Sequence, residues 1–224
     1  MGFFGKLFGK KGAELRDRVW SSTAAKFRDL AAQVAKDRER DVYPLVAFHF
    51  KQTGELVAES LRAAGVEFHA ADDFEDMLAG DVETWREAAP VIVFSSEVLP
   101  FSVRQESGAP RKDALLPPVA LHLAEHHPDP RRDTEVLNLD RAWGMEISFT
   151  CYTGLDEPWL RPFGIERVRK MMTMLGLSEN DLLESAQITS ALQRVREKLA
   201  GQVHREESCD SCEEWMRRNM PGEQ

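Results

Sequence analysis

The sequence is poor in cysteine, with three in 224 residues. That count is too low for a scaffold held by disulfides, and it favours a reducing compartment. No stretch approaches the roughly eighteen apolar residues of a membrane-spanning helix. No apolar run with a small-residue cleavage site follows the first lysines, so a secretory signal is not indicated. We therefore expect a cytoplasmic protein.

The sequence also lacks an excess of basic residues. Lysine and arginine number 29 against 38 aspartates and glutamates, which gives a formal net charge of −9. Nucleic-acid binders normally carry a basic domain or face, so we expect no nucleic-acid partner. The length suits one α/β domain with tails or two very small domains, and a chain of this size can bury about 70% of its surface.

Three catalytic signatures are missing. The sequence has no G-x-x-x-x-G-K-[ST], no G-x-G-x-x-G and no G-x-S-x-G. The first two build loops that hold phosphate at a helix start, and the third builds a nucleophile elbow. We expect no self-sufficient active site, no catalytic residue and no binding of ATP by this chain alone.

Residues 1–13 stand apart as a basic amphipathic N-terminal tail. Its apolar and basic residues recur at helix-like spacing: Phe3, Phe4, Lys6, Leu7, Phe8, Lys10 and Lys11. Such a pattern is typical of a segment that lies in an anionic membrane surface. The alternatives are a frayed terminus or a strap packed on the domain.

Periodicity predicts an α/β domain over residues 14–200. Apolar runs predict strands at 66–69, 44–50, 90–95, 119–125 and 146–153. Helical spacing predicts helices at 14–40, 53–64, 165–175 and 189–199. Residues 100–118 should be a surface loop, and 126–133 an irregular segment because of Pro128 and Pro130. The alternation predicts a parallel sheet flanked by helices, with a helical C-terminal extension.

Residues 201–224 form an acidic C-terminal tail that contains a C-x-x-C pair, Cys209 and Cys212. Two thiolates at this spacing can hold one face of a zinc ion, and His204 is a nearby third ligand. The simpler explanation, which we favour, is a helical tail with two ordinary thiols. A redox pair is the last alternative, because the thioredoxin pattern is absent.

A polar stretch follows the predicted strand at 119–125. His122, His126 and His127, with Glu125 and Asp129, invite a metal interpretation, but a strand followed by a turn would separate His122 from His126. Arg131 and Arg132 could hold a phosphate, or else pair with Asp129 and Asp133. The acidic pair Asp156–Glu157 is better explained as charge at a helix start than as a catalytic pair.

Residues 151–199 resemble a segment of SecA, the motor ATPase of bacterial preprotein translocation. The SecA pattern runs F-Y-x-S-L-E-D-x-L-M-R-x-F-G, then R-[IV]-x-x-[LM]-M-x-x-L-G, then V-T-x-A-I-x-x-A-Q-x-K. The matching residues are Tyr152, Leu155, Asp156, Glu157, Leu160, Arg161, Phe163, Gly164, Arg167, Val168, Met172, Leu175, Gly176, Glu184, Thr189, Ala191 and Lys198.

The beginning of the chain is similar to SecA as well. DRVWSSTAAKF at 17–27 looks like the start of the second nucleotide-binding domain of SecA, and 44–68 is similar to the strand, helix and strand that follow there. The resemblance covers about residues 15–200 and implies a RecA-like fold of the P-loop NTPase superfamily.

The middle of the chain departs from SecA where its ATP chemistry lies. The SecA run N-M-A-G-R-G-T-D has no counterpart after the strand at 90–95, and the arginine-finger run is reduced to Arg141 with Ala142 and Gly144. Residues 125–133 keep Glu125, His127, Arg131, Arg132 and Asp133 of a further SecA motif, with one extra residue in the spacing. Because an arginine finger must be placed accurately on the transferring phosphoryl group, catalysis is not supported. The phosphate-binding candidates are Arg131, Arg132 and Arg141.

The resemblance therefore implies a stand-alone, degenerate second motor domain. Our leading hypothesis is a catalytically inactive SecA-like module that acts through protein contacts, with SecA or the translocation channel as the partner. The alternatives are a subunit that supplies arginines in trans to a partner ATPase, and a zinc or redox protein that uses the C-x-x-C pair. A diverged domain that no longer takes part in translocation is a fourth possibility. The expected location is the cytoplasm, with peripheral contact at the inner membrane.

Overall fold

The computed structural model describes residues 15–73, 91–100, 118–143, 147–163, 174, 176, 178, 180–183, 186–203 and 206–220. The predicted N-terminal tail with its seven membrane-contact residues lies outside the described residues. So do His204, Gly144, nearly all of the predicted loop at 100–118 and most of the predicted helix at 165–175.

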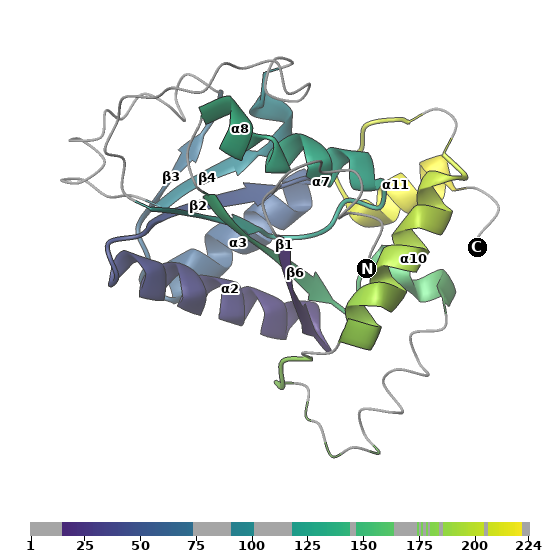
Figure 1. Ribbon diagram of the computed structural model, residues 1–224, viewed down its shortest axis with the longest axis horizontal. Coiled ribbons are helices and arrows are strands. Elements are labelled where there is room, and N and C mark those ends of the chain that lie inside the picture. Colours follow the sequence, from purple (N-terminus) through teal and green to yellow (C-terminus); the bar gives the residue numbers. More distant parts are fainter. Residues whose placement is uncertain are drawn as a thin grey trace.

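A six-stranded sheet forms the centre of the domain (Figure 1). The strand order is β1 (Leu15–Trp20), β6 (Ile147–Gly154), β5 (Val119–Leu123), β2 (Tyr43–Phe48), β4 (Val91–Ser95) and β3 (Phe68–Ala71). Each of these neighbouring pairs is parallel. The expected α/β class with a parallel sheet is confirmed.

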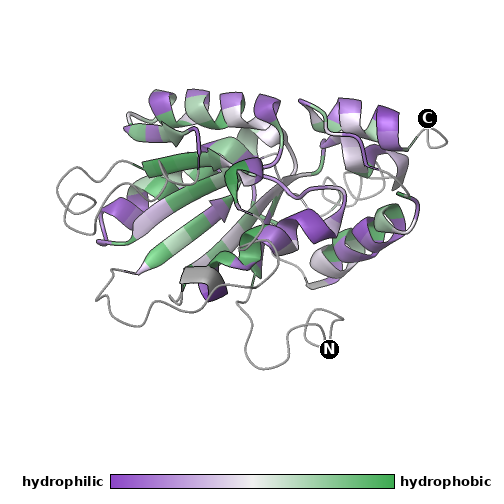
Figure 2. Cartoon of the chain, turned by 90° about the horizontal axis from the view of Figure 1, so that it is seen from above, coloured by the Kyte–Doolittle hydropathy of each residue, from purple (hydrophilic) through white to green (hydrophobic). Residues whose placement is uncertain are grey.

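Helices cover both faces of the sheet. Helices α2 (Thr23–Arg38) and α3 (Lys51–Ala63) lie on one face, and α7 (Pro130–Leu137) and α8 (Leu139–Trp143) lie on the other (Figure 1). A sheet covered on both sides needs strands that are apolar on both sides, and Figure 2 shows predominantly apolar strands beneath helices with hydrophilic outer faces. The strands predicted at 44–50, 90–95, 119–125 and 146–153 are confirmed with small shifts at their ends.

The C-terminal part of the chain is helical, as expected. The 3-10 helix η2 (Pro158–Phe163) follows β6, and α10 (Ala186–Ala200) and α11 (Cys212–Asn219) come later. These elements share an apolar cluster, which includes Trp159, Leu192 and Trp215. Helix α10 confirms the helix predicted at 189–199. In the part of the chain that is described, no helix is both long and apolar enough to cross a bilayer.

The helix predicted over 14–40 is wrong in its first third. Residues 15–20 form the edge strand β1, and α2 begins only after Ser22, whose hydroxyl accepts a hydrogen bond from the Ala25 backbone N–H at 3.2 Å. Leu15 and Val19 are four residues apart, and that spacing puts two side chains on one face of a helix and equally on one face of a strand. Pairing with β6 decides in favour of the strand.

The irregular segment predicted at 126–133 is also partly wrong, because α7 begins at Pro130. Asp129 caps this helix by accepting from the Arg131 backbone N–H at 3.0 Å. Proline suits the first helical position because its missing N–H would have no intrahelical partner there.

In α3, Val57 and Leu61 are buried as expected, but Leu56 is 37% exposed. The short strand predicted at 66–69 lies two residues later, at β3.

Candidate functional site at the strand ends

The carboxyl ends of the parallel strands meet at one edge of the sheet, and polar residues follow most of them. His49 follows β2, Ser96 follows β4, and Glu125, His126 and His127 come shortly after β5. All five of these side chains are buried. In open α/β sheets this edge is the usual place for ligands, so we take it as the candidate site.

Asp133, at the start of α7, is the centre of the buried network. Its side chain is 3% exposed and accepts hydrogen bonds from His49 Nε2 at 3.0 Å, His126 Nδ1 at 2.5 Å and the His127 backbone N–H at 2.9 Å. Arg196 of α10 completes the set with an ion pair to the same carboxylate. Burial alone would raise the pKa of Asp133, but Arg196 and His126 hold it well below its usual range.

His126 lies between two carboxylates. Its Nδ1 faces Asp133, and its Nε2 lies 3.0 Å from Asp17 Oδ1 on β1. Burial and Arg196 oppose the charged imidazolium, yet Cys151 and the two aspartates raise the pKa of His126 well above its ordinary value. The charged form therefore links β1 to the start of α7.

Glu125, which follows β5, accepts hydrogen bonds at the start of α3. Its Oε1 accepts from the backbone N–H groups of His49 at 3.2 Å and Phe50 at 3.0 Å, and its Oε2 accepts from Thr53 Oγ1 at 2.7 Å. Phe50 is the N-cap of α3 and offers no side-chain acceptor, so Glu125 takes over that role. Burial raises the pKa of Glu125, against the opposing influence of Lys26.

A buried ion pair joins α2 to the end of β6. Lys26 Nζ lies 2.5 Å from Glu157 Oε1, and Glu157 also accepts from Trp159 Nε1 at 2.7 Å. Burial lowers the pKa of Lys26, but Glu157 and Glu125 outweigh that effect and raise it. Asp156 accepts from the backbone N–H and hydroxyl of Thr23 at 2.7 Å each, so it does lie at a helix start, as expected.

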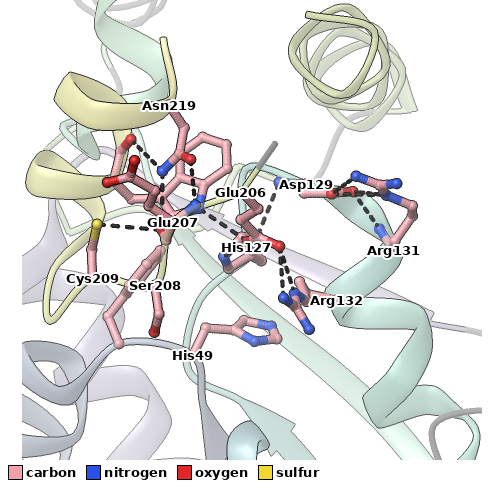
Figure 3. Close-up of polar contacts among 12 residues, drawn as sticks. His49, His127, Asp129, Arg131, Arg132, Glu206, Glu207, Ser208, Cys209 and Asn219 are labelled. Atoms are coloured by element: carbon pink, nitrogen blue, oxygen red, sulfur yellow. Dashed lines mark hydrogen bonds and ion pairs between the residues drawn. The ribbon is translucent and has the colours of Figure 1, made fainter. Parts of the chain in front are cut away.

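A cavity of about 190 Å³ opens beside this network. Figure 3 shows the polar contacts around it, including those of His127, Arg132 and Glu206. His127 forms part of its wall and stacks on Phe50 with ring centroids 5.1 Å apart. Burial and the nearby His49 lower the pKa of His127 to about 2, so its imidazole is neutral. The lining residues are His49, Phe50, Ser96, Glu97, His127, Arg132, Glu135, Glu206, Ser208, Cys209 and Trp215.

Residues 206–220, which we call the C-terminal segment, form one side of this cavity. Glu206 accepts from Arg132 Nη2 at 2.6 Å and from Trp215 Nε1 at 3.1 Å, and Trp215 is only 1% exposed. The Asp210 carbonyl accepts from the Gln52 backbone N–H at 3.0 Å. The segment is therefore attached to α3 and α7, and it covers part of the edge where ligands of open α/β sheets bind.

The three candidate phosphate-binding arginines do not converge on the cavity. Arg131 pairs with Asp129, as the sequence suggested, and its side chain is 69% exposed. Arg132 lines the cavity but pairs with Glu206 and Glu135, so the expected pairing with Asp133 is wrong. Arg196 takes that place instead. Arg141 lies in α8 and is not among the lining residues.

The three histidines have separate environments. His122 lies within β5, where its Nδ1 is 2.8 Å from Tyr152 Oη and its Nε2 is 2.9 Å from Asp37 Oδ2. It is thus separated from His126, as a strand followed by a turn predicts. His127 Nδ1 accepts from the Asp129 backbone N–H at 3.0 Å, while its Nε2 faces Glu206. These three histidines do not share one metal site.

The C-x-x-C pair lies at the start of α11. Cys212 is buried, whereas Cys209 is partly exposed and its Sγ donates to the Glu207 carbonyl at 3.5 Å. Burial raises the pKa of both thiols, and Glu214 adds to the effect at Cys209. A raised thiol pKa is the opposite of what an attacking redox cysteine needs. Because His204 lies outside the described residues, the zinc hypothesis for this pair stays a prediction.

Sequence reasoning missed several members of the network, and two of them had a detectable signal. Arg196 lies on the apolar stripe of α10, four residues after Leu192 and three before Leu199. Lys26 likewise continues the stripe of Leu30 and Val34 in α2. A charged residue on an apolar stripe must be paired when it is buried. No such signal marks the other three members. The register of β1 and β6 places Asp17 beside Cys151, and the C-terminal segment places Glu206 beside Arg132.

Most of this chain is similar in sequence to part of the protein translocase subunit SecA. It is 23% identical over 216 residues to the protein translocase subunit SecA of Coxiella burnetii, covering 83% of this chain and 23% of that protein. The SecA of Solidesulfovibrio magneticus is 22% identical over 190 residues, with 82% and 22% covered. The SecA of Laribacter hongkongensis is 31% identical over 93 residues, with 41% and 10% covered. The chain thus spans at most 23% of the length of these three relatives. No family model matches the sequence.

Among solved structures, similarity extends to an E. coli DEAD-box protein, SrmB, bound to regulator of ribonuclease activity A. The TM-score is 0.42 at 11% identity, with 65% of this chain and 79% of that chain covered. The C-terminal part of the Fun30 ATPase domain gives a TM-score of 0.40 at 14% identity, with 78% and 52% covered.

Proposed function

We propose that this chain is a SecA-like domain that takes part in protein translocation by binding a partner protein, and that it does not hydrolyse ATP on its own. The sequence similarity to SecA over more than four fifths of the chain supports the link to translocation. SecA itself or the translocation channel is the partner that this similarity favours. The same similarity would place the domain in the cytoplasm, with peripheral contact at the inner membrane.

One observation carries the non-catalytic part of the proposal. At the strand-end edge, the charged groups are engaged with other groups of this chain. Arg132 pairs with Glu206, Arg131 with Asp129, and Asp133 is surrounded by two histidines and Arg196. A catalytic arginine must be directed at the transferring phosphoryl group, and an arginine already bound to a carboxylate is not so directed.

The proposal also gives the edge a role. In SecA, the domain that the sequence resembles closes against the first nucleotide-binding domain around ATP. A domain of this kind would offer a surface of the same type to a motor protein. In this chain the C-terminal segment lies across part of that surface, so contact with a partner would compete with it.

The direct test is affinity capture with the full-length tagged chain. Cytosol and membranes of the native host are probed separately, and bound proteins are identified by mass spectrometry. We expect enrichment of SecA or channel subunits over an untagged control. Recovery of other proteins alone, from both fractions, would contradict the translocation link. Purified chain should also show no ATPase activity above a buffer blank, and a protein-dependent turnover would contradict the second half of the proposal.

A second candidate function rests on the exposure of Arg131. Its guanidinium lies at the start of α7 and is the most exposed of the arginines paired at this edge. To act on a nucleotide held by a separate ATPase, Arg131 would have to exchange Asp129 for the phosphate. The test compares Arg131→Ala, Arg132→Ala and Arg141→Ala with Arg40→Ala, an exposed arginine before β2 at the opposite end of the sheet. If this chain supplies an arginine in trans, at least one of the variants at Arg131, Arg132 and Arg141 lowers the ATPase rate of the partner. Arg40→Ala leaves that rate unchanged.

A further inference from the structure

Three side chains that can bind a metal come together on the face of the sheet that α7 covers. The proposed function assigns them no metal. They are Asp17 of β1, Cys151 of β6 and His126, which follows β5. One ligand atom from each lies within 4.8 Å of the other two. Within the described ranges, this is the one group of three or more His, Cys, Asp and Glu residues that meets this distance.

Strand register brings two of the ligands together. β1 pairs with β6 so that Asp17 and Cys151 are direct partners, and Cys151 in turn is the partner of Leu123 in β5. Residues opposite one another on paired strands project from the same face of the sheet. The chain then turns after β5, and His126 Nε2 comes to lie 3.0 Å from Asp17 Oδ1.

We propose that Asp17, His126 and Cys151 bind a zinc ion, with water as the fourth ligand. Carboxylate oxygen, imidazole nitrogen and thiolate sulfur are all ligands that zinc accepts, at about 2.0 to 2.3 Å in tetrahedral sites. Those bond lengths separate neighbouring ligand atoms by about 3.4 to 3.6 Å. The observed separations need to change by only tenths of an ångström at His126 and Asp17.

The surroundings of His126 match a metal-bound histidine. Asp133 holds the second ring nitrogen, Nδ1, at 2.5 Å and so directs Nε2 toward Asp17. A carboxylate on the far nitrogen is the usual partner of a histidine that binds a metal, because it fixes both the tautomer and the ring orientation. Arg196 and His49 in turn hold Asp133 in place.

The charged neighbours of the site suit a dication. Asp17 and Asp133 lie beside the two ring nitrogens of His126, and Arg196 is an ion-pair partner of Asp133. Zinc binds a thiolate sulfur and a nitrogen lone pair, so its entry would release to solvent any protons that these two ligand atoms carry.

Access to the site is from the side of Asp17. His126 and Cys151 are buried, but the Asp17 side chain is 13% exposed. A water ligand and any exchange of the ion with solvent would therefore lie on the side of Asp17. Zinc here would tie β1, β6 and the turn after β5 together, so its expected effect is on stability.

The test uses the fact that the chain has three cysteines, Cys151, Cys209 and Cys212. In the full-length Cys209→Ser/Cys212→Ser variant, any thiolate–metal bond must come from Cys151. We expect this variant to bind about one Co²⁺ per chain with a thiolate-to-cobalt charge-transfer band in the near ultraviolet, and Zn²⁺ to abolish the band. Adding Asp17→Asn should remove the band and the rise in melting temperature that zinc causes.

Two results would overturn the inference. One is a folded double-serine variant, judged by circular dichroism, that binds no cobalt. The other is a charge-transfer band that Asp17→Asn leaves unchanged. If the double-serine variant fails to fold, zinc content decides the matter: Cys151→Ser and Asp17→Asn should each hold one zinc fewer per chain than the unmodified protein. Equal zinc content in all three would refute the site.

Discussion

Arg132 donates two hydrogen bonds to one carboxylate oxygen of Glu206, from Nη2 at 2.6 Å and from Nε at 3.1 Å. The two residues are 74 positions apart in the chain. The other Glu206 oxygen accepts from Trp215 Nε1 at 3.1 Å. One carboxylate thus attaches the C-terminal segment to the start of α7 and to its own helix, α11.

Glu206→Gln should loosen the C-terminal segment without unfolding the domain. The amide keeps the shape of the side chain but loses the charge that Arg132 pairs with, at a cost of about 1 kcal/mol for a pair that is partly exposed. Amide hydrogen exchange over 206–220 should become several-fold faster, while the exchange of β2 and β5 should stay the same. The matched control is Glu213→Gln, since Glu213 and Arg161 are both well exposed and should contribute little. Equal effects of the two substitutions would show that Glu206 has no special role.

Acid should weaken the fold through His127. Burial lowers the pKa of this imidazole to about 2, whereas a histidine in an unfolded chain titrates near 6.5. A lowered folded pKa means that the unfolded chain binds the proton first. The contribution of His127 is therefore complete above about pH 6.5 and is lost as the pH falls, by on the order of 1–2 kcal/mol at pH 5.

Urea unfolding at pH 7.5 and pH 5.0 measures this loss. His127→Gln does not titrate, so its free energy of unfolding should fall less between the two pH values than that of the unmodified protein. The network around His126 and Asp133 is common to both proteins and cancels in the comparison. A fall of the same size in both would contradict the assignment.

Removing one partner of the buried Lys26–Glu157 pair should be among the most harmful substitutions. Lys26→Met fills the same space but leaves the Glu157 carboxylate buried without its cation, which typically costs about 3–5 kcal/mol. The control is Lys26→Met combined with Glu157→Gln, which removes both charges and should regain part of the loss. Denaturant unfolding of the three proteins gives the comparison. If Lys26→Met is as stable as the unmodified chain, the buried charge of Glu157 does not depend on Lys26 for its stabilisation.

Gly154 at the end of β6 should not tolerate alanine. A Cβ at this position would lie 2.7 Å from Asp156 Oδ1 and 2.8 Å from the Thr23 backbone nitrogen, where Asp156 holds the start of α2. Because backbone must move to relieve the second contact, Gly154→Ala should lower the free energy of unfolding by about 1–3 kcal/mol. Gly201→Ala is the control, since its nearest contact would be 3.6 Å away. Thermal unfolding that is unchanged by Gly154→Ala would argue against this close approach.

Apolar periodicity was enough to predict most of the sheet. The runs that became β2, β4 and β5 are buried on both faces, and such strands are visible as continuous apolar sequence. The edge strand β1 was predicted as helix because the spacing of Leu15 and Val19 fits either period, and because an edge strand has one neighbour only. The decisive interaction, the pairing with β6, joins segments more than a hundred residues apart.

The site was less predictable than the fold, for a related reason. His126 and Asp133 were noticed because they are close in sequence, but their other partners come from β1 and α10. Arg132 was matched to the wrong carboxylate since the sequence offered Asp133 next to it. Adjacent residues on α7 point in different directions, and only the folded chain brings Glu206 within reach of Arg132.

The most direct measurement of the central claim is binding between purified components. The full-length chain, labelled with a fluorophore, is titrated with purified SecA and separately with the translocation channel in lipid nanodiscs. The account predicts saturable binding to at least one of them, unchanged by Arg40→Ala and strengthened by Glu206→Gln, which loosens the segment over the proposed contact surface. Absence of binding to both, up to the solubility limit, would contradict the claim that this SecA-like domain acts through contacts with the translocation machinery.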